Sequence, residues 1–184
     1  MRRDHLYDEL LAAAIGLASS RLSLAIPSLR AVARACDVSA TAVYRHFESQ
    51  SALNRAVLLA VDSSFVAAMS NVDEPGRAPR ARLRLLACAY LEWGLANPGL
   101  YQLRFESADQ LGADHVHTDG ADVLLAQIGE LVRASGTASA VTAADLWGGI
   151  HGLTSLRLHK PAYTWPDDAT TQIDRLLAAW DLGL

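Results

Sequence analysis

The chain has 184 residues, of which 51% are hydrophobic, so it can bury a substantial core in one or two domains. It contains no run of about 18 uncharged apolar residues, which argues against a membrane-spanning helix, and two cysteines are too few for a disulfide framework. The net charge of −4 is unevenly spread: residues 1–50 carry six arginines against five acidic residues, whereas residues 101–184 carry five basic against eleven acidic residues.

Ala, Leu and Arg dominate and alternating β-branched runs are absent, so we predict an all-α protein with about nine helices. The first helix is expected at Leu6–Ser19, and a linker at Ser23–Pro27 follows it. Asp4, Asp8 and Glu9 occupy the positions where a signal peptide needs apolar residues, so a cytoplasmic protein is expected.

Residues 28–50 predict two short helices joined by a tight turn. Ser28 caps the first helix, which runs to Ala35 and has an apolar stripe at Leu29, Val32 and Ala33. The turn is at Cys36–Val38, and Ser39 caps the second helix, Ala40–Phe47. This helix buries Val43 and Phe47 and leaves outward Ala40, Thr41, Tyr44 and His46. Such a pair is the helix-turn-helix that reads the DNA major groove.

The remaining helices follow from periodicity and from breaks in the chain. A long helix at Gln50–Val72 connects the two parts, and two prolines and a glycine in residues 73–79 end it. Further helices are predicted at Arg80–Ala96, Leu100–Ser107, Asp119–Ala134, Thr142–His159 (with a capping box from Asp145), and from Asp167 or Asp168 to Trp180. Residues 1–50 then form one domain and residues 51–184 a helical body.

Residues 6–60 resemble the DNA-binding domain of the TetR family of bacterial regulators. The matching runs are Leu29–Arg34, Val38–Ser39, Val43–Phe47 (which holds the tetrapeptide YRHF) and Ser51–Leu53. The chain has Asp37 where the family usually has a turn glycine, and Gln50 where it usually has a lysine. Asp tolerates the left-handed conformation better than most residues, whereas losing the lysine removes a phosphate contact.

The resemblance implies a homodimer that binds a double-stranded DNA operator. The residues expected at the DNA are Ser28, Arg30, Ser39, Ala40, Thr41, Tyr44, Arg45, His46 and Gln50. For Arg45, a phosphate contact and an intramolecular salt bridge are both open. The N-terminal part has no strong basic character, so specificity should depend on base contacts and on dimer spacing.

The body resembles the TetR-family members that share a Trp-His-Gly signature, here Trp147, His151 and Gly152. A small, largely apolar effector is expected among Tyr90, Trp93, Tyr101, Phe105, Trp147 and His151. The alternative is that these side chains only fill the core.

Three glycines at 148, 149 and 152 each cost a helix interior about 1 kcal/mol, which close approach of another helix or a ligand would offset. In the resemblance, the last two helices form a four-helix bundle with those of a second subunit. The expected interface residues are Leu146, Ile150, Leu153, Leu156, Leu176, Leu177 and Trp180. A contact within one chain is the alternative.

No enzyme motif, cofactor site or metal site is predicted, since HExxH and CxxC are both missing and His115 and His117 stand in a loop-like stretch. The sequence therefore predicts a non-enzymatic transcriptional regulator, most simply a repressor released by an effector. Two alternatives stay open: a helical scaffold with a degenerate helix-turn-helix, and a ligand-sequestering or metal-responsive protein.

Overall fold

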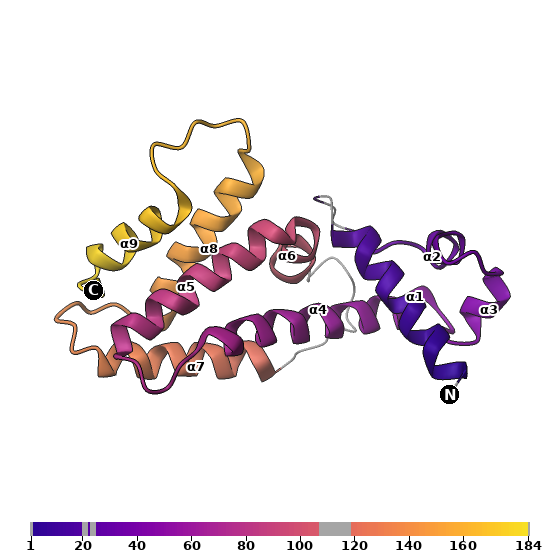
Figure 1. Ribbon diagram of the computed structural model, residues 1–184, viewed down its shortest axis with the longest axis horizontal. Helices are drawn as coiled ribbons and strands as arrows, with labels where there is room; N and C mark the ends of the chain where they lie inside the picture. Colours follow the sequence, from indigo (N-terminus) through magenta and orange to yellow (C-terminus); the bar gives the residue numbers. More distant parts are fainter. Residues whose placement is uncertain (1, 20–21, 23–24, 107–118, 184) are drawn as a thin grey trace. The chain divides into compact units, whose positions relative to one another are not determined.

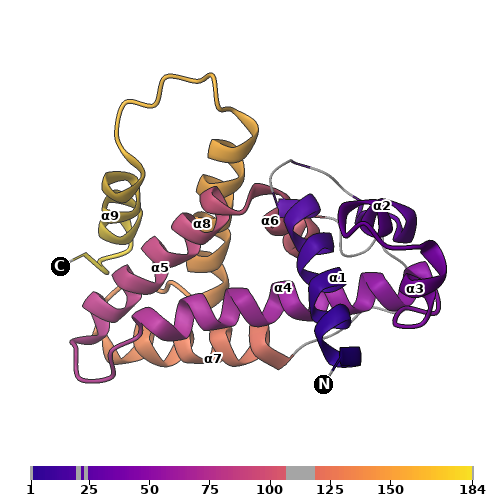
Figure 2. The ribbon, with the colours of Figure 1, turned by 45° about the vertical axis from the view of Figure 1, so that its right-hand side comes forward.

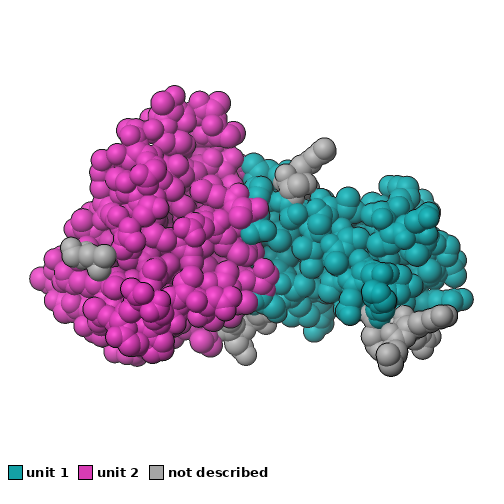
Figure 3. Space-filling view, viewed as in Figure 1, with its two compact units in different colours: residues 1–63, 97–118 teal, residues 64–96, 119–184 magenta. Residues whose placement is uncertain are grey.

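The computed structural model describes residues 2–19, 22, 25–106 and 119–183. Within these residues the fold is all α, with nine helices and no strand (Figures 1 and 2). The predicted fold class is confirmed. The chain divides into two compact units, Met1–Ser63 with Asn97–Thr118 and Ser64–Ala96 with Asp119–Leu184 (Figure 3).

The first unit holds α1 (Arg2–Ser19), α2 (Leu29–Ala35), α3 (Ala40–Tyr44), the first part of α4 (Gln50–Val72) and α6 (Pro98–Phe105). Helix α1 packs against both α2 and α6, and α2 packs against α3. Its core is formed by side chains at most 2% exposed, among them Leu10, Ala14, Val32, Val43, Phe47, Leu53, Val57, Val61, Tyr101 and Leu103.

The second unit holds the rest of α4, α5 (Pro79–Ala96), α7 (Asp119–Ala134), α8 (Ala143–His159) and α9 (Ala169–Ala179). Helix α5 is its centre, because it contacts α7, α8 and α9 (Figure 1). The buried side chains include Phe65, Met69, Leu83, Leu146, Ile150, Ile173, Leu177 and Leu182.

Polar caps set where several helices begin. Ser28, Ser39 and Asp168 accept a backbone hydrogen bond at the start of α2, α3 and α9. Thr142 and Asp145 form the predicted capping box at α8. Helix α4 has the predicted bounds, and α6 begins two residues early because Pro98 is tolerated in a first helical turn.

Helix α3 is shorter than predicted. It ends at Tyr44, because the amides of both His46 and Phe47 bond to the carbonyl of Val43 and close a turn there. On α1, Leu10, Ala14 and Ala18 are buried, whereas Leu17 of the same helix is 46% exposed.

In the described part of the chain, α4 is the one helix long and apolar enough to cross a membrane by length and composition, with 28% of the relevant window buried. The core helix of a water-soluble protein meets the same criterion. Helix α4 also carries Asp62, whose carboxylate pairs with Arg104 of α6 and is 14% exposed.

Candidate nucleic-acid interface and candidate ligand site

The turn between α2 and α3 is held by backbone bonds. Asp37 has φ +53°, so it takes the left-handed conformation expected from the sequence. The amide of Val38 bonds to the carbonyl of Ala33 (3.0 Å) and that of Asp37 to Arg34 (3.4 Å), which is the Schellman arrangement at a helix end. This turn fixes the direction in which α3 leaves α2.

Helix α3 presents one exposed and one buried side. Val43 is 0% exposed, and Phe47 just beyond the helix is 2% exposed, so both belong to the core. Ala40, Thr41 and Arg45 are exposed, and Tyr44 is 52% exposed. His46 is half-buried, with its ring centroid 6.4 Å from that of Tyr7 on α1. The outward side predicted for α3 is therefore available to a partner, His46 less so than the others.

Two exposed arginines belong to this helix pair, one on α2 and one directly after α3. Arg30 and Arg45 are exposed, and neither is in an ion pair with a described residue. The intramolecular bridge left open for Arg45 is thus not formed in the described part of the chain. The Oγ atoms of Ser28 and Ser39 accept the amides of Ala31 and Ala42, each at 3.2 Å, and both serines are exposed.

Gln50 has a different position from the one expected of a DNA contact. Its Oε1 accepts the Leu29 amide (3.0 Å), and its Nε2 donates to the Pro27 carbonyl (3.1 Å) and to Asn54 Oδ1 (2.8 Å). Both amide hydrogens are used within the chain, so Gln50 has none left for a phosphate. The sequence signal that we missed is the polar residue Asn54 one turn further along α4.

In the second unit, three of the predicted effector residues meet. The Tyr90 hydroxyl lies 3.1 Å from His151 Nδ1, and the ring centroids of His151 and Trp147 are 5.5 Å apart. Tyr90 is 5% exposed and Trp147 38% exposed, so the group runs from the core to the surface. Its members come from α5 and α8.

Trp93 lies on the inner side of this group. Its ring packs edge-on to that of Phe65 on α4, with the ring centroids 5.2 Å apart. Phe65 also packs edge-on to Tyr90, at a centroid distance of 5.4 Å. Its Nε1 donates to Ser64 Oγ (3.4 Å). Phe65 is therefore a member of this cluster that the sequence did not indicate.

Tyr101 and Phe105 belong to the other unit, on α6, and their ring centroids are 4.9 Å apart. Tyr101 is 0% exposed, so it fills the core of that unit and has no surface for an effector; here the core alternative holds. Phe105 is half-buried under the guanidinium of Arg104, 4.6 Å from its ring centroid.

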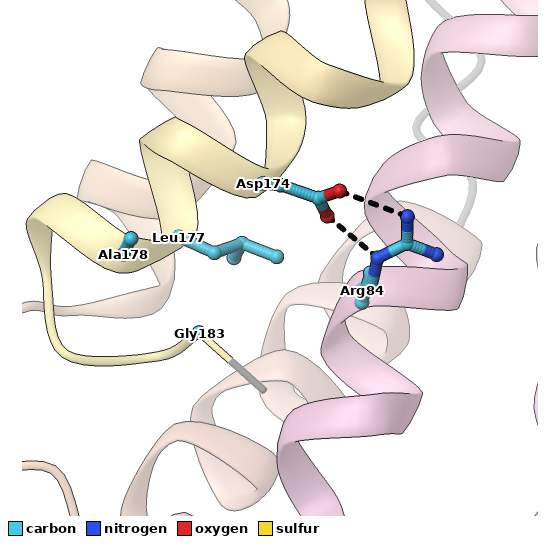
Figure 4. Close-up of a pocket in the computed structure, with 5 residues that line it drawn as sticks. All are labelled: Arg84, Asp174, Leu177, Ala178 and Gly183. Carbon is cyan, nitrogen blue, oxygen red and sulfur yellow. Dashed lines mark hydrogen bonds and ion pairs between the residues drawn. The ribbon is translucent and has the colours of Figure 1, made fainter.

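A hollow of about 430 Å³ lies elsewhere in the second unit, between α5 and α9 (Figure 4). It is lined by Arg84, Asp174, Leu177, Ala178 and Gly183, none of them predicted as effector residues. Arg84 Nε and Nη2 donate to the two carboxylate oxygens of Asp174 at 2.5 and 3.0 Å, which raises the pKa of Arg84. The charged groups of this hollow therefore neutralise each other.

The predicted interface residues divide into two sets. Leu146, Ile150 and Leu177 are 1%, 4% and 1% exposed in the single chain, so they have no area to bury against a partner, and the predicted interface loses them. Leu156 is 53% exposed, and Leu153, Leu176 and Trp180 are half-buried.

The three glycines of α8 also differ. A Cβ on Gly149 would lie 2.9 Å from Trp180 Cη2 and 3.0 Å from Leu176, so these two side chains of the same chain would have to shift to admit a larger residue there. A Cβ on Gly148 or Gly152 would have no other atom within 4 Å.

His115 and His117 lie outside the described residues, among which no group of three metal-ligating side chains occurs.

The family model described as "Tetracyclin repressor-like, C-terminal domain" matches residues 83–180, more than half of the chain. The chain belongs to the TetR family. It is therefore a DNA-binding transcription regulator of a non-enzymatic family. No curated protein matches the sequence.

Solved TetR-family structures share the fold over nearly the whole chain. A regulatory protein from Rhodococcus RHA1 has a TM-score of 0.75 at 21% identity, covering 96% of this chain and 95% of its own. A putative regulator from Shewanella has a TM-score of 0.67 at 22% identity, with 95% and 96% covered. A regulator from Haemophilus influenzae has a TM-score of 0.69 at 14% identity, with 97% and 98% covered. At these identities the likeness concerns the TetR fold.

Proposed function

We propose that this TetR-family chain is a cytoplasmic, homodimeric repressor that binds a palindromic operator and leaves it when a small, largely apolar effector binds the body. The observation that carries the proposal is the exposed side of α3. Thr41 and Tyr44 point out of a helix whose other side is locked into the core by Val43 and Phe47. A rigid helix with an exposed polar side suits base reading in the major groove.

The contacts divide into those that read bases and those that position the protein. Ser39, Ala40 and Thr41 stand at the beginning of α3, where base edges come closest, and Tyr44 follows one turn later. Arg30, Arg45 and the Ser28 hydroxyl contact phosphates. His46, which is half-buried, lies at the edge of this DNA-contacting surface. Gln50 acts indirectly. Its side chain bonds to the carbonyl that precedes α2 and to the first amide of α2, and so ties the start of α4 to the start of α2.

A homodimer follows from the size of the reading surface. One five-residue helix covers few base pairs, and a second copy must present its own helix about 34–36 Å away to meet the next major groove. The exposed apolar side chains of α8 and α9 support such an assembly, with Leu156 the most exposed and Leu153, Leu176 and Trp180 partly so.

The effector is proposed to bind beside Tyr90, Trp147 and His151, where an apolar wall carries a phenol and an imidazole as polar groups. It acts only if it binds the DNA-bound and the released states with different affinity. Helix α4 is the element through which we expect the change to pass, since its residues belong to both units.

The test is footprinting of the purified protein on its own promoter-proximal DNA across a salt titration. A protected near-palindrome, with affinity that falls as salt rises, is the expected result. The Tyr44→Ala variant should lose specific protection by about 10- to 100-fold and keep its fold, because Tyr44 is mostly exposed.

Folded wild-type protein that protects nothing above non-specific background at low salt would contradict the proposal. It would favour the scaffold with a degenerate helix-turn-helix. Unfolding of Tyr44→Ala would show instead that the side of α3 assigned to DNA is structural.

A further inference from the structure

The hollow between α5 and α9 has no part in the proposed DNA-contacting surface or in the proposed effector site, because it is lined by none of their residues. Its walls come from α5, from α9 and from the turn that follows α9 (Figure 4). Its volume of about 430 Å³ falls within the range of small-molecule sites. It therefore has room for a small organic molecule.

The turn after α9, which forms one wall of the hollow, has a defined conformation. Asp181 has φ +54°, and its amide bonds to the carbonyl of Ala178 at 3.1 Å. The amide of Leu182 bonds to the carbonyl of Leu177 at 2.8 Å, which completes a Schellman arrangement. The chain thus turns back along α9, and a Cβ on Gly183 would lie 3.5 Å from Ala178 Cα.

Two other segments hold this turn in place. Arg80 on α5 donates from Nη1 to the Gly183 carbonyl (3.2 Å) and from Nε to the Ser135 carbonyl (3.3 Å). Thr137 Oγ1, between α7 and α8, donates to the Trp180 carbonyl at 2.9 Å. The wall is therefore formed before any ligand arrives, as is usual for small-molecule sites.

The ion pair between Arg84 and Asp174 gives the hollow a donor and an acceptor on neighbouring atoms. The pair uses one N–H of Arg84 Nε, one of Nη2, and one bond at each carboxylate oxygen of Asp174. A guanidinium has further N–H groups, and each carboxylate oxygen can accept a second bond. Among the described residues these two side chains form no other hydrogen bond, and the Asp174 side chain is 47% exposed. A ligand can thus bind beside the pair without breaking it.

The charges next to the hollow balance one another. Arg84 pairs with Asp174, and Arg80 Nη2 lies 3.6 Å from Asp181 Oδ2 beside the turn. An anion would be attracted by the arginines and repelled by the carboxylates, and a cation would meet the reverse, so neither gains. Leu177, whose side chain points into the hollow in Figure 4, adds an apolar surface. These features suit an uncharged molecule with an apolar body.

We propose that the hollow between α5 and α9 binds a small uncharged molecule with a primary carboxamide or urea head and a compact apolar body. The carbonyl of the head accepts from Arg84, an N–H of the head donates to Asp174, and the body lies on Leu177 and Ala178. A bound molecule joins α5 to α9 and so stabilises the second unit. This inference goes beyond the proposed function and depends neither on DNA binding nor on the homodimer.

The test is an NMR titration of the full chain with benzamide, benzoate and benzamidinium. The three probes share a phenyl ring and differ in the charge of the head group. Benzamide should shift the backbone amide resonances of Ala178 and Gly183 saturably, with a Kd of about 1 mM. Benzoate and benzamidinium should bind at least about fivefold more weakly, because each is repelled by one member of the ion pair.

A pair of variants on α9 localises the binding. Ala178 is exposed and lines the hollow, so Ala178→Leu should fill the space without disturbing the core and should abolish the benzamide shift at Gly183. Ala179→Leu is the matched control, since Ala179 is also exposed but is not among the lining residues. It should keep the wild-type shift.

Asp174→Asn gives a second readout, which a merely structural ion pair would not change. It removes one negative charge and leaves Arg84 uncompensated, so the preferred probe should change from benzamide to benzoate. The side chain is half-exposed, so the variant should fold. If Ala178→Leu does not fold, this change of preference decides the question.

Two kinds of result would overturn the proposal. The first is the absence of a saturable shift at Ala178 and Gly183 up to about 10 mM benzamide, or a shift that persists in folded Ala178→Leu. The second is equal binding of the three probes by the wild-type chain, or an unchanged order of preference in Asp174→Asn. Either of these would show that the ion pair does not recognise the head group.

Discussion

Gln50 shows how one amide can join two elements. Through three hydrogen bonds it holds the start of α4, the first amide of α2 and the carbonyl of Pro27. The amide of Leu29 is one of the donors that a helix start leaves without an intrahelical partner, so Gln50 satisfies a group that would otherwise be costly in this half-buried place. A lysine here could not accept that bond.

Gln50→Ala should lower the free energy of unfolding by about 1–3 kcal/mol, because it leaves the Leu29 amide unsatisfied. It should weaken DNA binding without changing the slope of log affinity against log salt. Arg45→Ala is the contrasting variant: it should leave unfolding nearly unchanged and reduce the slope by about 0.9. Urea denaturation and salt-dependent binding measure the two effects.

A reduced salt slope in Gln50→Ala, with normal unfolding, would mean that Gln50 contacts the DNA after all. An unchanged slope in Arg45→Ala would remove that residue from the phosphate contacts.

At the scale of elements, Asp73 joins the end of α4 to α5 and α7. Its carboxylate accepts Arg82 Nε and Nη2 at 2.6 and 2.8 Å and also Gln127 Nε2, and the side chain is 11% exposed. The hydrogen bonds from Arg82 hold the pKa of Asp73 below its usual value. These hydrogen bonds therefore favour the ionised carboxylate of Asp73 over its protonated form.

Asp73→Asn should cost about 2 kcal/mol of stability at neutral pH. Since the folded-state pKa is lower than the unfolded value of about 3.9, this stability is present above about pH 4 and is lost as the pH falls through the folded pKa. Urea unfolding of wild type and variant should therefore differ most above about pH 5 and converge in more acidic solution. A difference independent of pH would show that the ion pair is not its source.

The packing of α9 on α8 gives a prediction from matched glycines. Gly149→Ala should destabilise the second unit by about 1–3 kcal/mol, because the new methyl group would lie 2.9 Å from Trp180. Gly16→Ala, on an exposed position of α1 with nothing within 4 Å, should instead stabilise by up to about 1 kcal/mol. Thermal unfolding of the two variants should shift in opposite directions; a stabilised Gly149→Ala would mean that the side chains of Trp180 and Leu176 move aside at no cost.

Helix starts could be predicted from the sequence because they are local. Ser28, Ser39, Thr142 and Asp168 carry short oxygen-bearing side chains just before apolar periodicity, and each caps as expected. The end of α3 was not predictable, since it depends on two amides sharing the Val43 carbonyl.

Contacts between helices that are far apart in the sequence could not be predicted from the sequence alone. The sequence indicated Tyr90, Trp147 and His151 as one group, and they do meet, but it also placed Tyr101 there, which lies on α6 in the core of the other unit. Leu146 and Ile150 looked like interface residues because α8 is apolar on two sides. Which side faces the core depends on where α5 lies.

At the scale of the whole molecule, the proposed two-fold symmetry determines how the operator is built. Inserting five base pairs between the half-sites found by footprinting should lower affinity at least about 100-fold, because it turns one half-site to the opposite side of the duplex. Gel-shift titrations on matched duplexes measure this. Unchanged affinity would mean that each copy binds by itself.

The two compact units are not consecutive along the chain, since Asn97–Thr118 returns to the unit that Ser63 has left. A hybrid regulator made by one splice near residue 50 would carry α1, α2 and α3 into its new host but leave behind α6, against which α1 packs. In its new host, helix α1 would pack against the host's α6 and not against its own. Exchange of DNA specificity between relatives should therefore succeed more often when two segments are transplanted together than when the N-terminal segment moves alone.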